Sequence, residues 1–196
     1  LGACALDDAA PLEALCAATG CPGLVYDRPG LGGSSAVTGP RGPAFFEVEA
    51  GGVLPALLAA CGIDDAILVG HSDGGTIALL HAARFEVTAC IVMAPHLMVE
   101  DKSVKAIQAA RVAYETTDLR ERLKRFHKDV DCAFWQWNDV WLSEPFSHFD
   151  IHADCLNITA PVLAMQGVDD AYGSMRHIDD LRTAGSVQRE VLQACG

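Results

Sequence analysis

The stretch that decides the fold is Ala66-Ile67-Leu68-Val69-Gly70-His71-Ser72-Asp73-Gly74-Gly75. Its first four residues form an apolar run typical of a buried strand, and residues 76–84 after it have an apolar helical pattern. A chain that passes from strand to helix so quickly must turn sharply, so we expect Ser72 in a strained backbone conformation. Side chains two positions before and after Ser72 would clash there, which explains Gly70 and Gly74. The pattern predicts a nucleophilic hydroxyl raised above a sheet.

Outward from this turn, short apolar runs alternate with longer helical patterns. Strands are expected at 24–26, 66–69, 87–93, 162–165 and 187–192, and helices at 46–61, 76–84 and 174–184. The strand runs are continuously apolar, so we expect burial on both faces and a parallel sheet with helices on each side. Residues 99–157 break this rhythm with a purely helical pattern, which predicts a helical insertion between the third and fourth strands.

Length and composition exclude several classes of protein. The chain has 196 residues, of which 51% are hydrophobic and 20% charged, as in a globular domain with a sizeable core. The formal net charge of −12 disfavours nucleic acid and anionic membrane surfaces as partners. No apolar run approaches the roughly 20 residues that cross a bilayer, and no signal peptide pattern is visible.

The cysteine and histidine positions indicate neither a disulfide framework nor a metal site. The eight cysteines show no Cys-x-x-Cys spacing and several lie inside apolar runs, so we interpret them as reduced core thiols of a cytoplasmic protein. The seven histidines are scattered and no His-Glu-x-x-His motif occurs, so no metal and no other cofactor is expected.

Three stretches carry a resemblance to the α/β-hydrolase superfamily. They are residues 26–35 (YDRPGLGGSS), residues 70–75 (GHSDGG) and residues 166–173 (QGVDDAYG). They occur in family order, and the resemblance covers essentially the whole chain. It implies a mostly parallel α/β-hydrolase sheet with helices on both faces, formed by residues 1–98 and 158–196. The insertion at 99–157 would then be a helical cap.

The resemblance implies a triad of serine, acid and histidine. Ser72 would be the nucleophile, and the backbone N–H of Asp73 would bind the oxyanion. The acid, which orients and stabilises the histidine, would lie in the loop after the strand at 162–165. In similar proteins it comes three residues after the loop glycine, which favours Asp170 and leaves Asp169 as the second choice.

The triad histidine is absent from its family position. His177 is the only histidine after Asp170 and follows it by seven residues, which leaves no room for the intervening helix and strand. In similar proteins the last strand ends in a small residue and a glycine directly before the histidine, so we expect that histidine beyond Gly196. Leu1-Gly2 likewise resembles a point after the family's third strand. We therefore expect the first strands and the last helix to lie outside this sequence, and the 196-residue chain alone to be inactive.

Four more side chains are candidates to line the pocket. His71 flanks the nucleophile and His96 follows the strand at 87–93, whereas Trp137 and Trp141 belong to the insertion. The two tryptophans share a helix face, an arrangement that favours packing of the cap over contact with a ligand.

The resemblance implies a serine hydrolase that acts on a small or medium ester, or on a related acyl or carbon–carbon bond. Its partner would be a small-molecule substrate. The alternative is a non-catalytic protein of hydrolase fold that binds a small ligand. Nothing in the sequence indicates the oligomeric state.

Overall fold

The structure, a computed structural model, describes residues 10–193. The chain divides into two compact units: Leu1–Arg41 with Gln108–Trp141, called here the cap unit, and Gly42–Ile107 with Leu142–Gly196, called the sheet unit. The expected cap at 99–157 is thus shared between the two units. Cys4, Cys195 and the two chain ends, where the sequence analysis expects missing elements, lie outside the described residues.

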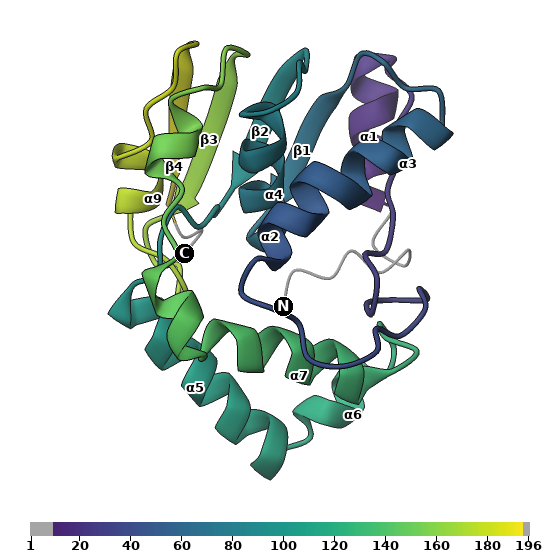
Figure 1. The fold of residues 1–196 in the computed structure, drawn as a ribbon, viewed down its shortest axis with the longest axis vertical. Coiled ribbons are helices and arrows are strands. Elements are labelled where there is room, and N and C mark those ends of the chain that lie inside the picture. The colour runs from purple at the N-terminus through teal and green to yellow at the C-terminus, as the bar shows by residue number, and fades with distance from the viewer. Residues whose placement is uncertain (1–9, 194–196) are drawn as a thin grey trace. The chain divides into compact units, whose positions relative to one another are not determined.

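The sheet unit contains a four-stranded parallel sheet in the order β1-β2-β3-β4 (Figure 1). The strands are Ile67–His71 (β1), Ala89–Met93 (β2), Val162–Gly167 (β3) and Val187–Leu192 (β4). The helix α4 (Asp73–Ala82) connects β1 to β2. Parallel strands require such crossover connections. The predicted α/β class and its parallel sheet are confirmed.

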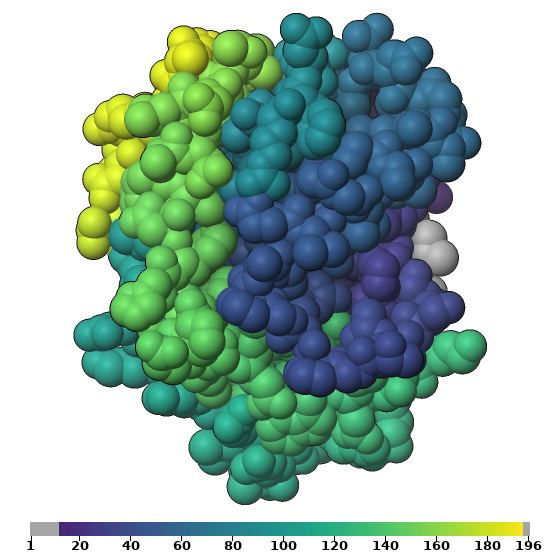
Figure 2. All heavy atoms as spheres, viewed as in Figure 1, coloured from purple at the N-terminus to yellow at the C-terminus, as the bar shows by residue number. Residues whose placement is uncertain are grey.

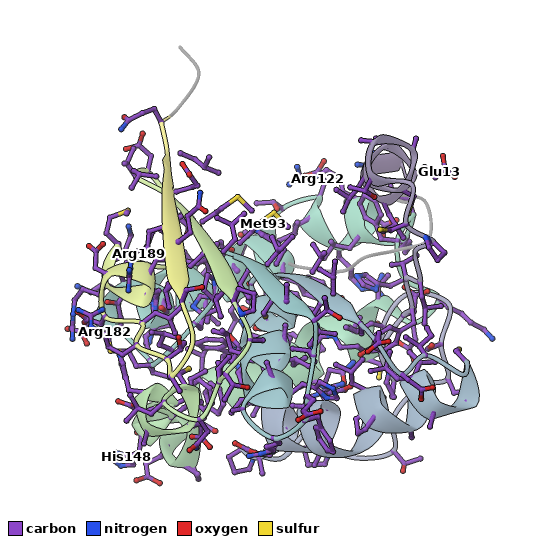
Figure 3. All side chains as sticks on the ribbon, turned by 90° about the horizontal axis from the view of Figure 1, so that it is seen from above. Glu13, Met93, Arg122, His148, Arg182 and Arg189 are labelled. Carbon is purple, nitrogen blue, oxygen red and sulfur yellow. The ribbon has the colours of Figure 1, made fainter. Side chains whose placement is uncertain are left out.

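Side chains alternate between the two faces of this sheet. The face covered by α4 and by α9 (Arg176–Asp179) holds the deeply buried Leu68, Cys90, Val92, Val162 and Ala164. The opposite face carries Ile67 and Val69, which are 49% and 45% exposed, and Met93, labelled in Figure 3. Burial therefore alternates along the described strands, whereas the sequence analysis expected it on both faces.

The last strand forms one edge of the sheet. Its residues are yellow in Figure 2, and Val191 and Leu192 are 47% and 52% exposed. A short, partly charged strand is a common way to end a sheet, because it offers little flat apolar surface to other chains.

Two expected elements differ from the structure. Residues 24–26 form no strand, because the described part of the cap unit contains no strand with which they could pair. The helix expected at 174–184 is reduced to the four residues of α9. The carbonyls of Ile178, within α9, and of Leu181, just after it, accept hydrogen bonds from the Arg189 guanidinium.

The helix expected at 46–61 is present, but it is irregular. It comprises α2 (Phe45–Val48), a π-helical segment (Glu49–Val53) and α3 (Leu54–Ala60). Pro55 lies in the first turn of α3, directly after the π-helical segment, and it cannot donate a backbone hydrogen bond there.

All elements between β2 and β3 are helical, as predicted. They are α5 (Asp101–Thr116), α6 (Leu119–Leu123), α7 (Val130–Trp141), a 3₁₀ segment (Glu144–His148) and α8 (His152–Cys155). The remaining helix, α1 (Ala10–Thr19), belongs to the cap unit. A core of Tyr114, Leu123, Val130 and Phe134 holds α5, α6 and α7 together. Among residues 10–193, no helix has the length and hydropathy needed to cross a bilayer.

Candidate active site

Ser72 lies between the last residue of β1 and the first residue of α4. Its φ of 53° and ψ of −124° fall in a region that residues with a Cβ atom rarely adopt. The Ser72 N–H donates to the carbonyl of Met93 at 2.9 Å, and its own carbonyl accepts the N–H of Gly75 at 2.9 Å. The strained turn predicted from the sequence is present, and hydrogen bonds to both neighbouring elements hold it.

Of the two glycines that flank Ser72, Gly70 serves the expected purpose and Gly74 does not. A Cβ at Gly70 would lie 2.2 Å from the carbonyl oxygen of Gly74, so this position admits only glycine. A Cβ at Gly74 itself would meet nothing within 4 Å, and the prediction of a clash there was wrong. The second close approach involves Gly75, where a Cβ would lie 3.3 Å from the Cβ of Pro95. The start of α4 therefore has room for a side chain at position 74, whereas Pro95, in the loop after β2, leaves little room at position 75.

The oxyanion donor expected at Asp73 is the first residue of α4. The first N–H groups of a helix make no hydrogen bond within the helix and carry partial positive charge, which favours a developing anion. Asp73 is itself only 6% exposed. Its position suits the expected role, which stays a prediction.

His96 reaches Ser72 from the loop that follows β2. Its Nε2 lies 3.4 Å from the Ser72 Oγ. Thr76 of α4 clamps the backbone of His96: its hydroxyl donates to the His96 carbonyl and accepts the His96 N–H, each at 2.9 Å. The predicted pocket residue His96 is therefore in contact with the predicted nucleophile.

The His96 ring is neutral in this environment. Burial is the main cause that lowers its pKa to about 3, and His177 lowers it further, while Asp170 and Glu100 act in the opposite direction. A neutral imidazole keeps one ring N–H donor and one acceptor nitrogen.

Asp170 lies in the loop after β3, where the family's acid was expected. Its Oδ1 accepts the N–H groups of Tyr172 and Gly173, at 2.7 and 3.0 Å. Asp170 is half-buried and its charge acts on both His71 and His96, whereas Asp169 is exposed. The choice of Asp170 over Asp169 as the acid stays a prediction.

The start of α5 fixes this acid loop. Lys102 Nζ donates to the carbonyl of Gly173 at 3.1 Å, and the Ser103 hydroxyl donates to that of Tyr172 at 2.6 Å. Glu100 accepts both the N–H and the hydroxyl of Ser174. These contacts bridge about seventy positions of sequence, and nothing in the spacing of the residues indicated them beforehand.

His177, which the sequence analysis rejected as the base, faces Glu100. Its Nδ1 accepts the N–H of Leu97 at 3.1 Å, so the proton of the neutral ring is assigned to Nε2, which lies 3.2 Å from the Glu100 Oε2. The ring is fully buried and meets the His96 ring edge-on, with centroids 5.3 Å apart.

The other candidate pocket residues have different surroundings. His71 is exposed at the end of β1. Trp137 packs against the hydrophobic core of the cap unit, and Trp141, on the same helix, is 2% exposed. Packing accounts for both tryptophans, and a contact with ligand stays a prediction. Within residues 10–193, no group of three or more His, Cys, Asp and Glu side chains is arranged to hold a metal ion.

Comparison with solved structures identifies similar folds. An α/β-hydrolase enzyme from a Medee basin deep-sea metagenome library aligns with a TM-score of 0.60 at 19% identity, over 84% of this chain and 68% of that one. The enol-lactonase from Burkholderia xenovorans aligns with a TM-score of 0.60 at 23% identity, over 85% and 70%. A carboxylesterase structure from the thaumarchaeon Nitrososphaera gargenis aligns with a TM-score of 0.63 at 18% identity, over 87% and 70%.

This chain spans 62% to 77% of the length of eight such structures. A search of curated proteins finds no match. The profile of the Alpha/beta hydrolase family, however, matches residues 2–195. With the parallel sheet and the strained serine turn at its carboxyl edge, this match shows that the chain belongs to the α/β-hydrolase family.

Proposed function

We propose that this protein is a serine hydrolase that cleaves a small or medium carboxylic ester, with Ser72 as its nucleophile. The strained backbone of Ser72 between β1 and α4 carries the proposal. Strain of this kind persists only where the surrounding structure enforces it, and it concentrates at functional sites.

In the proposed reaction, the Ser72 Oγ attacks the ester carbonyl carbon, and the hydroxyl proton passes to a histidine base. The carbonyl oxygen becomes negative and is stabilised by the Asp73 N–H at the start of α4. When the tetrahedral species collapses, the C–O bond to the alcohol breaks and the histidine returns the proton to the leaving oxygen. Water then hydrolyses the acyl-serine by the same steps.

Asp170 is the proposed acid of the triad. Its carboxylate, held by the N–H groups of Tyr172 and Gly173, would orient the base and stabilise its protonated form. The base in this proposal is the histidine that the sequence analysis expects beyond Gly196. Two of the similar structures are an enol-lactonase and a carboxylesterase, which supports a carboxylic ester as the substrate class.

Labelling with a fluorophosphonate probe tests the proposal, with the protein expressed from its full gene and with p-nitrophenyl esters as substrates. We expect labelling and ester turnover in the wild type and neither in Ser72→Ala. Asp170→Asn should lower turnover by about 10⁴-fold, whereas Asp169→Asn, the matched control, should leave it unchanged. A wild type that binds small esters without labelling or turnover would instead indicate the non-catalytic alternative.

A further inference from the structure

Among the described residues other than glycine, two have a positive φ. Both lie close to the contact between Ser72 and His96. Ser72, with φ 53°, directly follows β1, and Ala94, with φ 47°, directly follows the neighbouring β2. The Ala94 N–H donates to the carbonyl of Met165 in β3 at 2.8 Å, which fixes the bend. Two strained bends at adjacent strand ends thus bring the side chains of Ser72 and His96 together, and strain retained in this way points to function.

The path from Ala94 to His96 is fixed at every step. Pro95 packs against Gly75, where a Cβ would lie only 3.3 to 3.4 Å from the Pro95 Cα and Cβ. Thr76, which is fully buried, then holds both backbone polar groups of His96. α4 therefore begins directly after the nucleophile and fixes the loop that presents the imidazole to it.

We infer that His96 is a positioning residue that holds the Ser72 hydroxyl through its neutral ring, and that it is not the general base. This inference rests on the proposed function of Ser72. The contact between Nε2 and Oγ restricts the serine rotamer before a substrate binds. Correct placement of a reacting atom matters because an error of about 1 Å can cost roughly 100-fold in rate.

Burial keeps the His96 ring neutral, and the two histidines near it act in the same direction, whereas the two nearby carboxylates oppose it. The histidines are His177 of α9, which contacts the ring edge-on, and His71 at the end of β1. The carboxylates are those of Asp170, in the loop after β3, and of Glu100, directly before α5. His177 is engaged with Glu100 and with the Leu97 N–H, so its proton sits away from His96. A ring held in this way remains a hydrogen-bond partner, but it is a poor proton acceptor near neutral pH.

The first test measures the rate of fluorophosphonate labelling of Ser72 as a function of pH. His96→Leu should slow labelling by about 10- to 100-fold without shifting the midpoint of the pH profile. His96→Gln, whose amide can replace Nε2, should restore most of the rate. His148→Gln is the control, because that side chain is 81% exposed. It is labelled in Figure 3. An unchanged rate in His96→Leu, or a loss near 10⁶-fold with loss of the pH dependence, would overturn the inference.

The second test does not require activity. In ¹⁵N spectra of the histidine rings, we expect the His96 signals to stay constant between pH 5 and 8 and to shift in Ser72→Ala. His96 signals that titrate in this range, or that ignore Ser72→Ala, would contradict the inference. A wild type without labelling would refute the proposed function. The spectra alone would then show whether His96 contacts Ser72.

Discussion

Among single residues, the serine turn depends most on the absence of a side chain at position 70. We predict that Gly70→Ala destabilises the protein by at least about 1–3 kcal/mol, the usual cost of overpacking, because its Cβ would lie 2.2 Å from a backbone oxygen. Ser72 would be displaced, so fluorophosphonate labelling should be lost as well. Urea unfolding and probe labelling measure the two effects.

Gly74→Ala provides the matched control. Its Cβ would meet no atom within 4 Å, and alanine favours a helix over glycine by up to about 1 kcal/mol. The variant should be at least as stable as the wild type. A destabilisation equal to that of Gly70→Ala would show that the turn tolerates neither substitution and that the close approach at Gly70 is not the cause.

At this same scale, the sequence predicted Ser72 and Asp170 but not the residues that hold them. A glycine-flanked serine after an apolar run is a local pattern, and so is an acid three residues after a loop glycine. The bend at Ala94 has no such signature, because an alanine in the sequence gives no indication of a positive φ. The contact of Gly75 with Pro95 depends on how the loop after β2 folds back, and no spacing along the chain encodes it.

At the scale of elements, Thr76 joins α4 to the loop after β2. Thr76→Val keeps the shape of the side chain but leaves the N–H and carbonyl of His96 without this buried partner. We predict a loss of about 1–3 kcal/mol in the free energy of unfolding. Thr76→Ser retains the hydroxyl and should lose less, and equal losses in both variants would refute the role of the hydroxyl. Urea unfolding of the two variants makes the comparison.

Within the cap unit, α7 and the part of α5 from Gln108 onward depend on Phe134. Its ring is 1% exposed and stacks on Tyr114 with centroids 3.7 Å apart. Phe134→Ala should cost the cap unit about 3–5 kcal/mol. All three tryptophans belong to that unit, so urea unfolding followed by tryptophan fluorescence reports on it. Val112→Ala, at a position on α5 that is 58% exposed, should change the midpoint little.

The elements themselves were predictable where hydrophobic periodicity decides them. β1, β2, β3 and α4 follow apolar runs, and these elements and β4 lie within a few residues of their expected positions. The predictions of secondary structure failed where contacts with other elements determine the local conformation. Residues 24–26 have the composition of a strand but no strand beside them in the described cap unit. The helix after Asp179 is replaced by contacts from arginines, among them Arg189, which is near Arg182 in Figure 3.

For the molecule as a whole, buried histidines make stability depend on pH. They are His81, His96, His127 and His177, each at most 6% exposed. Burial lowers the pKa of each below its ordinary value of 6.5. The unfolded chain therefore binds protons below about pH 6.5 that the folded chain does not. This contribution to stability is complete above pH 6.5 and declines as the pH falls.

We predict that the urea midpoint falls between pH 7 and pH 5. Because the pKa of His96 is about 3, that residue alone accounts for about 2 kcal/mol between pH 6.5 and 5. The pKa values of Glu100 and Asp150 are also lowered, but from 4.5 and 3.8, so these carboxylates lose their contribution only below about pH 4.5. His96→Gln should flatten the slope above pH 5, since it removes one of the titrating groups. A midpoint that stays constant from pH 7 to pH 5 would mean that these rings can be protonated inside the fold.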